Sequence, residues 1–410
     1  MSVGAITLTK AINMTYIGID IGKSKHCIAA IEQTAKVLLK PTFVSQDNEG
    51  FENIAQQLRL LGSCDTVKIG MEASGHYWVH LFNFLTEQGW QVELFNPVLS
   101  SAQARTHLRG RKTDKDDAIA IAKTLRDGAY SPWAIPAGEH AEMKLLCRHR
   151  SFIVSELSNA KRRLTGLLDL AFPEFAVHFS DTYGKAPIAV LKAAPSARAL
   201  LALPVKELTE TLQKHSAGRH GETMTKKLRE SAKKSIALSH ESEALSFNIL
   251  SMIKQVEFFN QQLEECDQQI KTIFAELNDP IEKIPGIGAK TGPVILSEFG
   301  ELSRFKGGYK KLLAFAGLDP RIRQSGQWQG AVKMSKRGSP ALRTALFQAA
   351  SMGRLHNADL QAIYHHHKHT KGKNHRVAIS HVARKLVQII WVTCRNGKPF
   401  DLDKISPIST

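Results

Sequence analysis

The amino-acid sequence predicts an α/β domain at the N-terminus, followed by a mainly α-helical and basic region. The strand pattern is clearest at residues 15–22. There Ile17, Ile19 and Ile21 alternate with glycines and Asp20, so one face of the strand enters a core. The helical pattern is clearest at residues 239–277, which contain no glycine or proline and carry apolar residues at helical spacing. At 410 residues the chain is long enough for two or three domains.

The charge of the chain is distributed unevenly. There are 55 lysines and arginines against 38 aspartates and glutamates, a net charge of +17. Residues 1–130 hold 14 basic and 13 acidic side chains, whereas residues 131–410 hold 41 and 25. A nearly neutral domain is therefore followed by a basic one, and this excess indicates a nucleic-acid partner.

Cysteine spacing and hydropathy argue against other classes of protein. The five cysteines are far apart and form no CxxC pair, which favours a reducing compartment and no zinc site. No run of about 18 apolar residues is present, and the N-terminus lacks the pattern of a signal peptide. We therefore expect a cytoplasmic protein with no membrane partner.

The first 130 residues predict three strands and then alternating helices and strands. We expect strands at 15–22, 26–32, 36–44, 66–72 and 91–95, and helices at 47–61, 76–88 and 113–127. Asp47 is a plausible cap for the first helix. Three strands, helix, strand, helix, strand, helix is the order of a ribonuclease-H-like fold.

Helices dominate beyond a proline-containing linker near residues 131–138. We expect a long helix at 141–170, irregular chain at 173–185 and shorter helices with basic joints at 186–235. The helix at 239–277 would be about 55 Å long at 1.5 Å per residue, and its apolar stripe needs a partner, as in a coiled coil or bundle. The sequence thus divides into an N-terminal domain (1–130), a helical basic linker region (131–238), a coiled-coil helix (239–279) and a C-terminal domain (280–410).

Four carboxylates fall where this topology can bring them together. Asp20 lies on the first strand, and Glu72 ends the fourth strand, beside it in this fold. Asp114 and Asp117 are three residues apart near the start of a helix, so both project from one face toward the sheet. Close carboxylates repel each other unless cations separate them, and two Mg²⁺ ions about 4 Å apart would relieve this and hold a phosphodiester.

Each carboxylate also has an ordinary explanation when it is considered alone. Asp114 and Asp117 could complement the dipole of a helix N-terminus, a role that Asp116 fits, and Glu72 could lie in a surface turn. As a set in this order, however, the four favour a metal site.

Residues 284–292, Ile-Pro-Gly-Ile-Gly-Ala-Lys-Thr-Gly, precede an apolar run and predict a helix-hairpin-helix. Backbone N–H groups around Gly286 and Gly288, together with Lys290, could hold a phosphate at the helix start without reading sequence. The alternative is a tight turn between two helices.

A second group of motifs follows at residues 315–343. Ser325 precedes a glycine and lies among cations that could stabilise charge developing on phosphoryl oxygens. Ser335 is a rival nucleophile, and an ordinary Ser-Gly turn is the remaining alternative. The surrounding cations are Arg321, Arg323, Lys333, Lys336, Arg337 and Arg343. The nearby histidines 365–367, 369 and 375 cannot all face one ion, and we interpret them as a solvated basic face open to nucleic acid.

At these motifs the chain resembles the DEDD transposases and site-specific recombinases, which include the Piv-type DNA invertase and insertion-sequence members guided by a structured bridge RNA. The resemblance spans nearly the whole chain, with the motifs in the family order. They are Gly18-Ile-Asp20, Glu72-Ala-Ser-Gly75, Lys112 to Ala118, Ile284-Pro-Gly-Ile-Gly288, Ala316-Gly-Leu318, Gln324-Ser-Gly326 and Ser335-Lys-Arg-Gly338.

By this resemblance, the N-terminal domain would be RuvC-like, with its four carboxylates holding Mg²⁺. A coiled coil would join it to a transposase domain whose serine attacks DNA and forms a covalent 5′-phosphoserine link. We carry that serine over to Ser325, with Ser335 as the fallback. The segment between Gly184 and Lys234 and the tail beyond Arg376 are longer than compact family members need.

The resemblance also implies partners. These are the DNA of the element ends and of the target, a structured guide RNA, and further copies of the chain in a dimer or tetramer. In the family's dimer-built tetramer, the two domains of one active site can come from different subunits.

The expected function is that of an insertion-sequence transposase or DNA recombinase that cleaves and exchanges strands with Mg²⁺ through a phosphoserine, guided by a bridge RNA. The rival enzyme is a RuvC-like metal-dependent nuclease or junction resolvase that uses water as the nucleophile. A third hypothesis is a nucleic-acid-binding protein whose carboxylates are surface charges. It predicts binding that weakens with salt and no cleavage with Mg²⁺.

Overall fold

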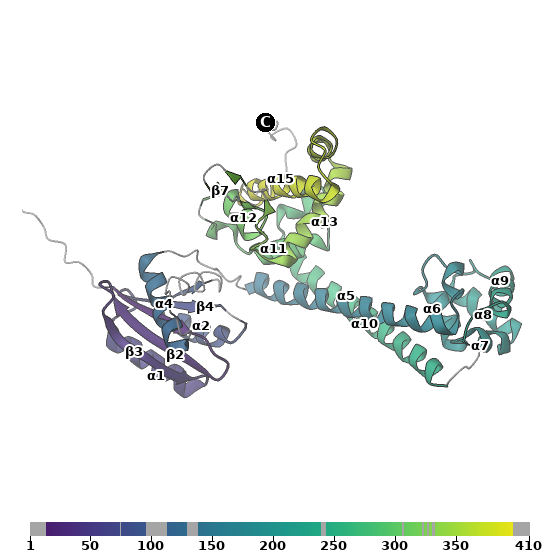
Figure 1. The fold of residues 1–410 in the computed structure, drawn as a ribbon, viewed down its shortest axis with the longest axis horizontal. Helices are drawn as coiled ribbons and strands as arrows, with labels where there is room; N and C mark the ends of the chain where they lie inside the picture. Colours follow the sequence, from purple (N-terminus) through teal and green to yellow (C-terminus); the bar gives the residue numbers. More distant parts are fainter. Residues whose placement is uncertain are drawn as a thin grey trace, which may run out of the picture. The chain divides into compact units, whose positions relative to one another are not determined.

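The structure is a computed structural model (Figure 1). It describes residues 14–73, 75–95, 113–128, 138–238, 243–305, 307–321, 324–325, 328–329 and 333–396. The predicted linker lies outside these residues except for Gly138. The chain divides into two compact units, unit 1 at residues 1–135 and unit 2 at residues 136–410.

Unit 1 confirms the predicted order of three strands, helix, strand, helix, strand, helix. Its elements are β1 (Thr15–Asp20), β2 (Lys25–Glu32), β3 (Val37–Ser45), α1 (Asn48–Leu61), β4 (Val67–Glu72), α2 (Trp78–Glu87), β5 (Gln91–Phe95) and α4 (Asp114–Asp127). Asp47 caps α1 as expected, since its carboxylate accepts a hydrogen bond from the Gly50 N–H at 2.8 Å.

The five strands form one mixed sheet in the order β3-β2-β1-β4-β5. The first three strands pair antiparallel, whereas β1, β4 and β5 run parallel to one another. β1 therefore lies at the centre of the sheet, between an antiparallel and a parallel neighbour. This arrangement agrees with the α/β class expected from the sequence.

Helices cover both faces of the sheet. Ile17 and Ile19 of β1 and Met71 of β4 pack in one core with α1 and α2 residues such as Ile54 and Leu81. The other face packs against α4, where Tyr16 and Ile31 share a cluster with Ile121, Ala122 and Leu125. Alternate residues of β1 and β4 therefore face α4.

Two glycines allow α4 to lie close to the sheet. A Cβ on Gly18 would lie 2.0 Å from the Ala118 carbonyl oxygen and 2.5 Å from the Ala122 nitrogen. A Cβ on Gly70 would lie 2.8 Å from the Phe95 ring and 3.2 Å from the Ile121 side chain of α4. Gly18, two residues before Asp20, therefore allows a close approach, and what approaches is the backbone of α4.

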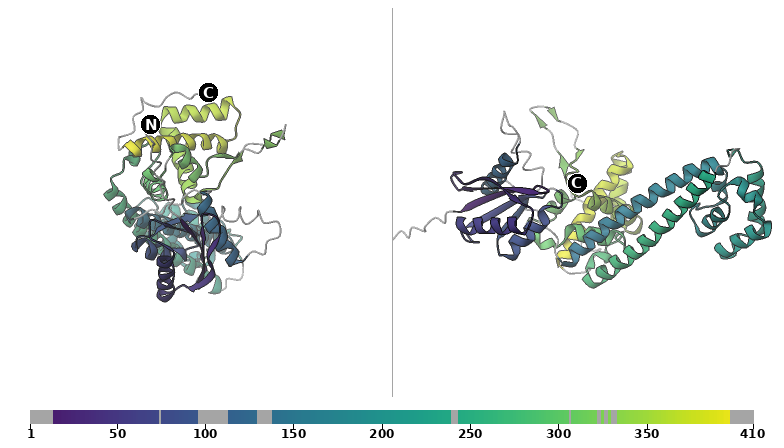
Figure 2. Two further views of the ribbon diagram at one scale, coloured as in Figure 1. Left: turned by 90° about the vertical axis from the view of Figure 1, so that its left-hand side faces the viewer. Right: turned by 90° about the horizontal axis from the view of Figure 1, so that it is seen from below.

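Unit 2 is built on two long helices, α5 (Gly138–Ala171) and α10 (Glu243–Leu277), which run side by side (Figures 1 and 2). Leu157 and Ala160 of α5 are buried with Val256 of α10, and the Cys266 thiol donates to the Leu146 carbonyl. The helices are antiparallel, because early residues of α5 meet late residues of α10. The apolar stripe expected at 239–277 thus has its partner within the same chain.

A group of short helices fills the chain between the two long ones. These are a 3-10 turn η1 (Phe175–His178), α6 (Lys185–Ala193), α7 (Ala197–Ala202), α8 (Val205–His215) and α9 (Glu222–Lys233). Their shared core joins Leu164 of α5 to Ile249 of α10. It includes Phe172, Phe175 and Leu228, so this region is a packed module.

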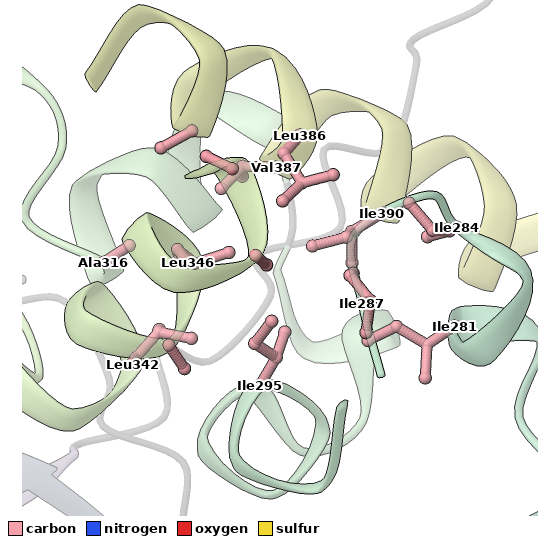
Figure 3. Close-up of a cluster of buried hydrophobic side chains, with 14 of the residues drawn as sticks. Ile281, Ile284, Ile287, Ile295, Ala316, Leu342, Leu346, Leu386, Val387 and Ile390 are labelled. Carbon is pink, nitrogen blue, oxygen red and sulfur yellow. The ribbon is translucent and has the colours of Figure 1, made fainter. Parts of the chain in front are cut away.

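The remaining chain folds into a mainly helical domain. Its elements are η2 (Pro280–Lys283), α11 (Thr291–Phe299), η3 (Leu302–Arg304), α12 (Tyr309–Phe315), β6 (Pro320–Arg321), β7 (Gln324–Ser325), β8 (Trp328–Gln329), β9 (Lys333–Met334), α13 (Pro340–His356), α14 (Ala358–His365), the π-helical η4 (His366–Thr370) and α15 (His375–Asn396). Figure 3 shows part of its core, where Ile284, Ile295, Leu346 and Leu386 come together from separate elements.

Among the described residues, one helix is long and apolar enough to cross a membrane by length and composition, at His375–Arg395 in α15. Half of that window is buried inside the protein. Its Val382, Leu386 and Ile390 belong to the core with α11 and α13. These contacts are those of a core helix.

Candidate active site

Asp20 and Glu72 end two neighbouring strands of unit 1. β1 and β4 run parallel with Ile19 opposite Met71, so the next residues along each strand are Asp20 and Glu72. Because Ile19 and Met71 are buried against α1 and α2, these carboxylates leave the sheet on the opposite face, the face of α4. They therefore share one end and one face of the sheet.

Helix α4 brings two more carboxylates to the same end. Its late residue Leu125 packs near Tyr16 at the start of β1, whereas its early residue Ala118 packs with Cys27, which is opposite Asp20. The helix is thus antiparallel to β1, and Asp114 and Asp117 in its first turns lie toward the Asp20 end.

The N-terminal cap of α4 involves Asp116, the acidic residue that we did not include among the candidate metal ligands. The Thr113 hydroxyl donates to the Asp116 carboxylate at 2.7 Å and accepts from the Asp116 N–H at 3.3 Å. Asp116 is therefore engaged in the cap at the start of α4.

Cys27 lies beside this carboxylate set. Burial, followed by the negative charges of Asp20 and Asp114, raises the pKa of its thiol to about 11, while Lys115 and Lys25 act in the opposite direction. Because the charges of both aspartates act on this one thiol, the carboxylates of Asp20 on β1 and Asp114 on α4 both lie near Cys27. The thiol itself remains neutral at physiological pH.

The donor chemistry of the set fits Mg²⁺, which prefers carboxylate oxygens. Asp20, Glu72, Asp114 and Asp117 would be the residues that hold it. In the part of the chain that the structure describes, no group of three or more His, Cys, Asp or Glu side chains stands close enough to bind a metal as it is. The four carboxylates thus share one end and one face of the sheet without forming a closed cage.

The glycine-rich turn of unit 2 has an open side and a packed side. Gly286 has φ +88°, and a Cβ there would lie 2.3 Å from the Ala349 oxygen, so this glycine faces α13. A Cβ on Gly288 would have nothing within 4 Å, and the Gly288 N–H donates to the Thr291 hydroxyl at 3.2 Å. Lys290 forms an ion pair with Asp267 of α10 at 3.1 Å.

Ser325 lies on a hairpin that leaves the helical core of unit 2 (Figure 1). Strands β7 and β8 pair antiparallel, with Ser325 opposite Trp328. β6 and β9 pair nearer the core, with Arg321 opposite Lys333, and both of these side chains are exposed. We call residues 320–334 the serine arm. Arg323 lies outside the described residues.

The base of the serine arm is held by contacts that the sequence did not predict. The Ser335 hydroxyl donates to the Asp319 carboxylate, and the Ser335 N–H donates to the Asp319 carbonyl at 2.9 Å. Lys336 adopts φ +56° and donates its N–H to the Gly317 carbonyl at 3.1 Å. The rival serine is therefore bonded to an aspartate, and the exposed cation Arg337 lies two residues further on.

Close packing strengthens the same base. A Cβ on Gly338 would lie 1.9 Å from the Phe315 carbonyl oxygen. Arg343 donates to the carbonyls of Ala316 at 3.4 Å and Gly338 at 3.5 Å. The two short motifs that flank the serine arm, residues 316–319 and 335–338, are thus one structural feature.

The histidine tract packs partly against α15. His367 and His381 stack with ring centroids 3.6 Å apart, and the Tyr364 hydroxyl lies 2.9 Å from His375 Nδ1. Within the tract, burial and nearby positive charges lower the pKa of His367, and burial together with His367 and Arg384 lowers the pKa of its stacking partner His381 on α15 to about 4. Part of the tract is therefore neutral and packed, and not wholly a solvated basic face.

Comparison with known proteins places this geometry in a family. A model described as "Transposase", for DEDD transposases of the IS110 type, matches residues 17–173. A second, described as "Transposase IS116/IS110/IS902 family", matches residues 278–365. The first match includes all four carboxylates, and the second includes the glycine-rich turn and the serine arm.

Several curated proteins are similar over almost their whole length. An uncharacterized 44.8 kDa protein of insertion element IS116 from Streptomyces clavuligerus is 24% identical over 94% of this chain and 96% of its own. The pilin gene-inverting protein of Moraxella lacunata is 24% identical over 94% and 98%. The transposase for insertion sequence element IS1328 of Yersinia enterocolitica is 25% identical over 95% and 99%.

An α/β sheet with carboxylates at its strand ends, followed by a basic helical unit with matching motifs, defines a DNA transposase or recombinase. The chain belongs to the IS110-type family of DEDD transposases.

Proposed function

We propose that this protein is an insertion-sequence transposase or recombinase that cuts DNA through a covalent phosphoserine at Ser325. The observation that carries the proposal is the gathering of Asp20, Glu72, Asp114 and Asp117 at one end and one face of the unit 1 sheet. The family membership and the names of the relatives support strand exchange as the outcome of cleavage.

The carboxylates would bind and orient Mg²⁺ at the scissile phosphate. Bound there, Mg²⁺ would neutralise negative charge on the phosphoryl oxygens. Asp20 and Glu72 project from rigid strands, so they would fix the position of the phosphate. Asp114 and Asp117 would complete the set from the first turns of α4, which the cap at Thr113 holds in place.

Ser325 would supply the nucleophile. Its hydroxyl oxygen would form a bond to phosphorus as the bond to the 3′-oxygen breaks, the serine proton passing to a base and the 3′-oxygen taking up a proton. The product would be a 5′-phosphoserine and a free 3′-hydroxyl. This exchange of one phosphoester for another conserves the bond energy needed for rejoining, and exposed Arg321, Lys336 and Arg337 would stabilise the added charge.

The basic excess of unit 2 supports a role in holding nucleic acid. Its 41 basic residues against 25 acidic ones suit DNA of the element ends and target, and a structured bridge RNA as guide. Family membership leads us to propose further that the active form is a dimer or tetramer. Gly288 and Lys290, on the open side of the glycine-rich turn, are candidate phosphate contacts, whereas Gly286 would act by packing.

The first test is adduct formation. The full chain with its co-purifying RNA is incubated with Mg²⁺ and labelled junction DNA, and a denaturing gel is examined for a protein–DNA adduct. We expect an adduct for the wild type and none for Ser325→Ala or Asp20→Ala. Ser351→Ala is the matched control, since it removes a hydroxyl that bonds only within α13, to the Phe347 carbonyl at 2.8 Å.

The competing outcome is equally clear. Cleavage without an adduct, at the same rate in Ser325→Ala, would identify a metal-dependent nuclease or resolvase that uses water. Binding without any Mg²⁺-dependent cleavage would contradict both enzyme hypotheses.

A further inference from the structure

One row of residues crosses the unit 1 sheet from the carboxylates to the edge strand. Glu72 on β4 lies beside Asp20 on β1, Asp20 pairs with Cys27 on β2, and Cys27 pairs with Phe43 on β3. Residues in register on adjacent strands point to the same face, so all four face the side covered by α4. Phe43 is therefore the outermost member of a row that begins with the candidate metal ligands.

Phe43 is an exposed aromatic side chain with two lysines over its ring. Its surface is 39% exposed, whereas its neighbour Val44 is buried on the other face. The Lys25 ammonium lies 4.2 Å from the ring centroid, and the Lys115 ammonium lies 5.9 Å from it. The two lysines come from different elements, β2 and α4, and both are exposed.

Lys115 also ties this ring to the carboxylate set. It sits in the first turn of α4 between Asp114 and Asp117. The charges of Lys25 and Lys115 act on the Cys27 thiol together with those of Asp20 and Asp114, so cations and carboxylates lie around one thiol. An aromatic face with two ammonium groups thus borders the carboxylate end of the sheet.

We propose that Phe43, Lys25 and Lys115 form a nucleotide subsite for the DNA strand that is cut. An unpaired base would stack on the Phe43 ring, and the two ammonium groups would contact the phosphates that flank it. Aromatic rings with adjacent cations are the usual platform for unpaired strands, because every base has a stacking face and every linkage has a charge. The inference rests on the proposed function, since it takes the phosphate at the carboxylates as the scissile one.

Sheet geometry sets the position of the stacked base. β1 and β3 are two strand spacings apart, about 10 Å at 4.8 Å per step. A stacked strand advances about 3.4 Å per nucleotide. The base on Phe43 therefore lies within about three nucleotides of the scissile phosphate, and the strand at that point is locally unpaired.

A photochemical crosslink tests the position directly. The full-length protein is mixed with junction DNA that carries 5-iododeoxyuridine at one of six positions around the cleavage point, in single-stranded and duplex form. We expect the peptide containing Phe43 to crosslink to single-stranded DNA at a position within three nucleotides of the cut. A crosslink elsewhere in the protein, or one made only by iodinated RNA, would overturn the proposal.

Affinity measurements provide the second arm. Phe43→Leu keeps an apolar side chain without the ring, and we expect it to weaken single-strand binding about tenfold. Phe43→Trp should bind within about twofold of the wild type, because stacking is retained. Phe152→Leu on α5 is the matched control, a phenylalanine that is 58% exposed and outside the proposed subsite. Equal affinity of Phe43→Leu and wild type would overturn the proposal.

The contribution of the two lysines is tested by the salt dependence of single-strand binding. Lys25→Gln and Lys115→Gln should each lower the slope of log affinity against log salt by about 0.7 for a single strand. Lys206→Gln, at an exposed position on α8, should leave the slope unchanged. An unchanged slope in both subsite variants would remove the lysines from the subsite.

The design separates this inference from the proposed function. Asp20→Ala should abolish cleavage and adduct formation while leaving the Phe43 crosslink intact. If the wild type forms an adduct and yet no Phe43 crosslink appears, the subsite is wrong and the recombinase proposal stands. If the crosslink appears without any adduct, the phosphoserine proposal is the one that fails.

Discussion

At the scale of single residues, Gly18 decides whether the carboxylates can meet. It lies two positions before Asp20, and its missing side chain lets the α4 backbone lie against β1. Because Asp114 and Asp117 belong to that helix, their distance from Asp20 depends on this contact. The strand sequence shows that this glycine alternates with buried isoleucines, but it does not say which element packs against it.

Gly18→Ala should therefore loosen α4. The added Cβ would lie 2.0 Å from the Ala118 oxygen, and relieving such a clash in a packed core costs about 1–3 kcal/mol. Hydrogen exchange of β1, β2 and α4 amides measures this locally, which suits a chain of two units. We expect faster exchange there, together with weaker Mg²⁺-dependent cleavage.

Gly166→Ala is the control for that substitution. Gly166 lies inside α5 with nothing within 4 Å of a Cβ, so alanine should stabilise the helix by about 1 kcal/mol. The same chemical change should thus slow exchange in α5 while it speeds exchange around Gly18. Slower or unchanged exchange in Gly18→Ala would show that a Cβ fits between β1 and α4, and it would contradict this prediction.

At the scale of elements, the serine arm depends on its base. Asp319 and Ser335 stand 16 positions apart in the chain, one at each end of the arm. Their hydrogen bond, the turn at Lys336 and the packing of Gly338 join the two ends beside the start of α13. Ser335 is thus placed to position the arm, a role distinct from that of a nucleophile.

Ser335→Ala separates these two roles. A hydrogen bond to a charged group contributes about 1.5–3 kcal/mol, so its loss should slow adduct formation about tenfold or more. The adduct should still map to the peptide containing Ser325, and Ser335→Thr, which keeps the hydroxyl, should restore most of the rate. An adduct that maps to Ser335, or a complete loss in Ser335→Ala with Ser325→Ala still active, would reverse the assignment.

Local pattern and long-range contact explain which elements could be predicted. The strands of unit 1 and helix α10 could be predicted from the periodicity of their apolar residues, and the start of α1 from its capping residue Asp47. Both signals lie within a few residues of the chain. The packing partner of α10 could not be predicted, because α5 lies about a hundred residues earlier and any helix with an apolar stripe could pack against α10. The Asp319–Ser335 hydrogen bond could not be predicted either, because its two residues are 16 positions apart and no local pattern links them.

The candidate site shows the same division. The four carboxylates could be named from their motifs and their order, since the fold order fixes which strands are neighbours. Phe43 could not, because its place beside Asp20 requires the registers of two strand pairs, and one of these pairs contains an irregularity at residues 28–31. The sequence identifies which residues carry useful chemical groups. The register of the strand pairs determines which of those residues lie side by side across the sheet.

At the scale of the whole molecule, the two units differ in net charge, and the difference is larger than their difference in length explains. Unit 1 is nearly neutral, with 14 basic and 13 acidic residues, whereas unit 2 carries an excess of 16 positive charges. A neutral unit with converging carboxylates suits chemistry on a phosphate that is already bound. A basic unit suits the electrostatic holding of a long polyanion.

This division predicts where the salt dependence of DNA binding arises. Each phosphate contact by a lysine or arginine contributes about 0.9 to the slope of log affinity against log salt for duplex DNA. Lys336→Gln and Arg337→Gln, at the base of the serine arm, should each lower the slope of duplex binding by about one and weaken all sequences alike. Lys206→Gln on α8, which is exposed and pairs only loosely with Glu210 at 4.0 Å, is the control and should leave the slope unchanged.

A substitution in the carboxylate set completes this test of the two units. Because Asp20→Ala removes a negative charge from unit 1, it should leave the slope nearly as it is while cleavage is lost. If the slope of duplex binding instead fell with Asp20→Ala and not with Lys336→Gln or Arg337→Gln, the holding of duplex DNA would have to be assigned to unit 1, in addition to the single-strand contacts proposed for Lys25 and Lys115.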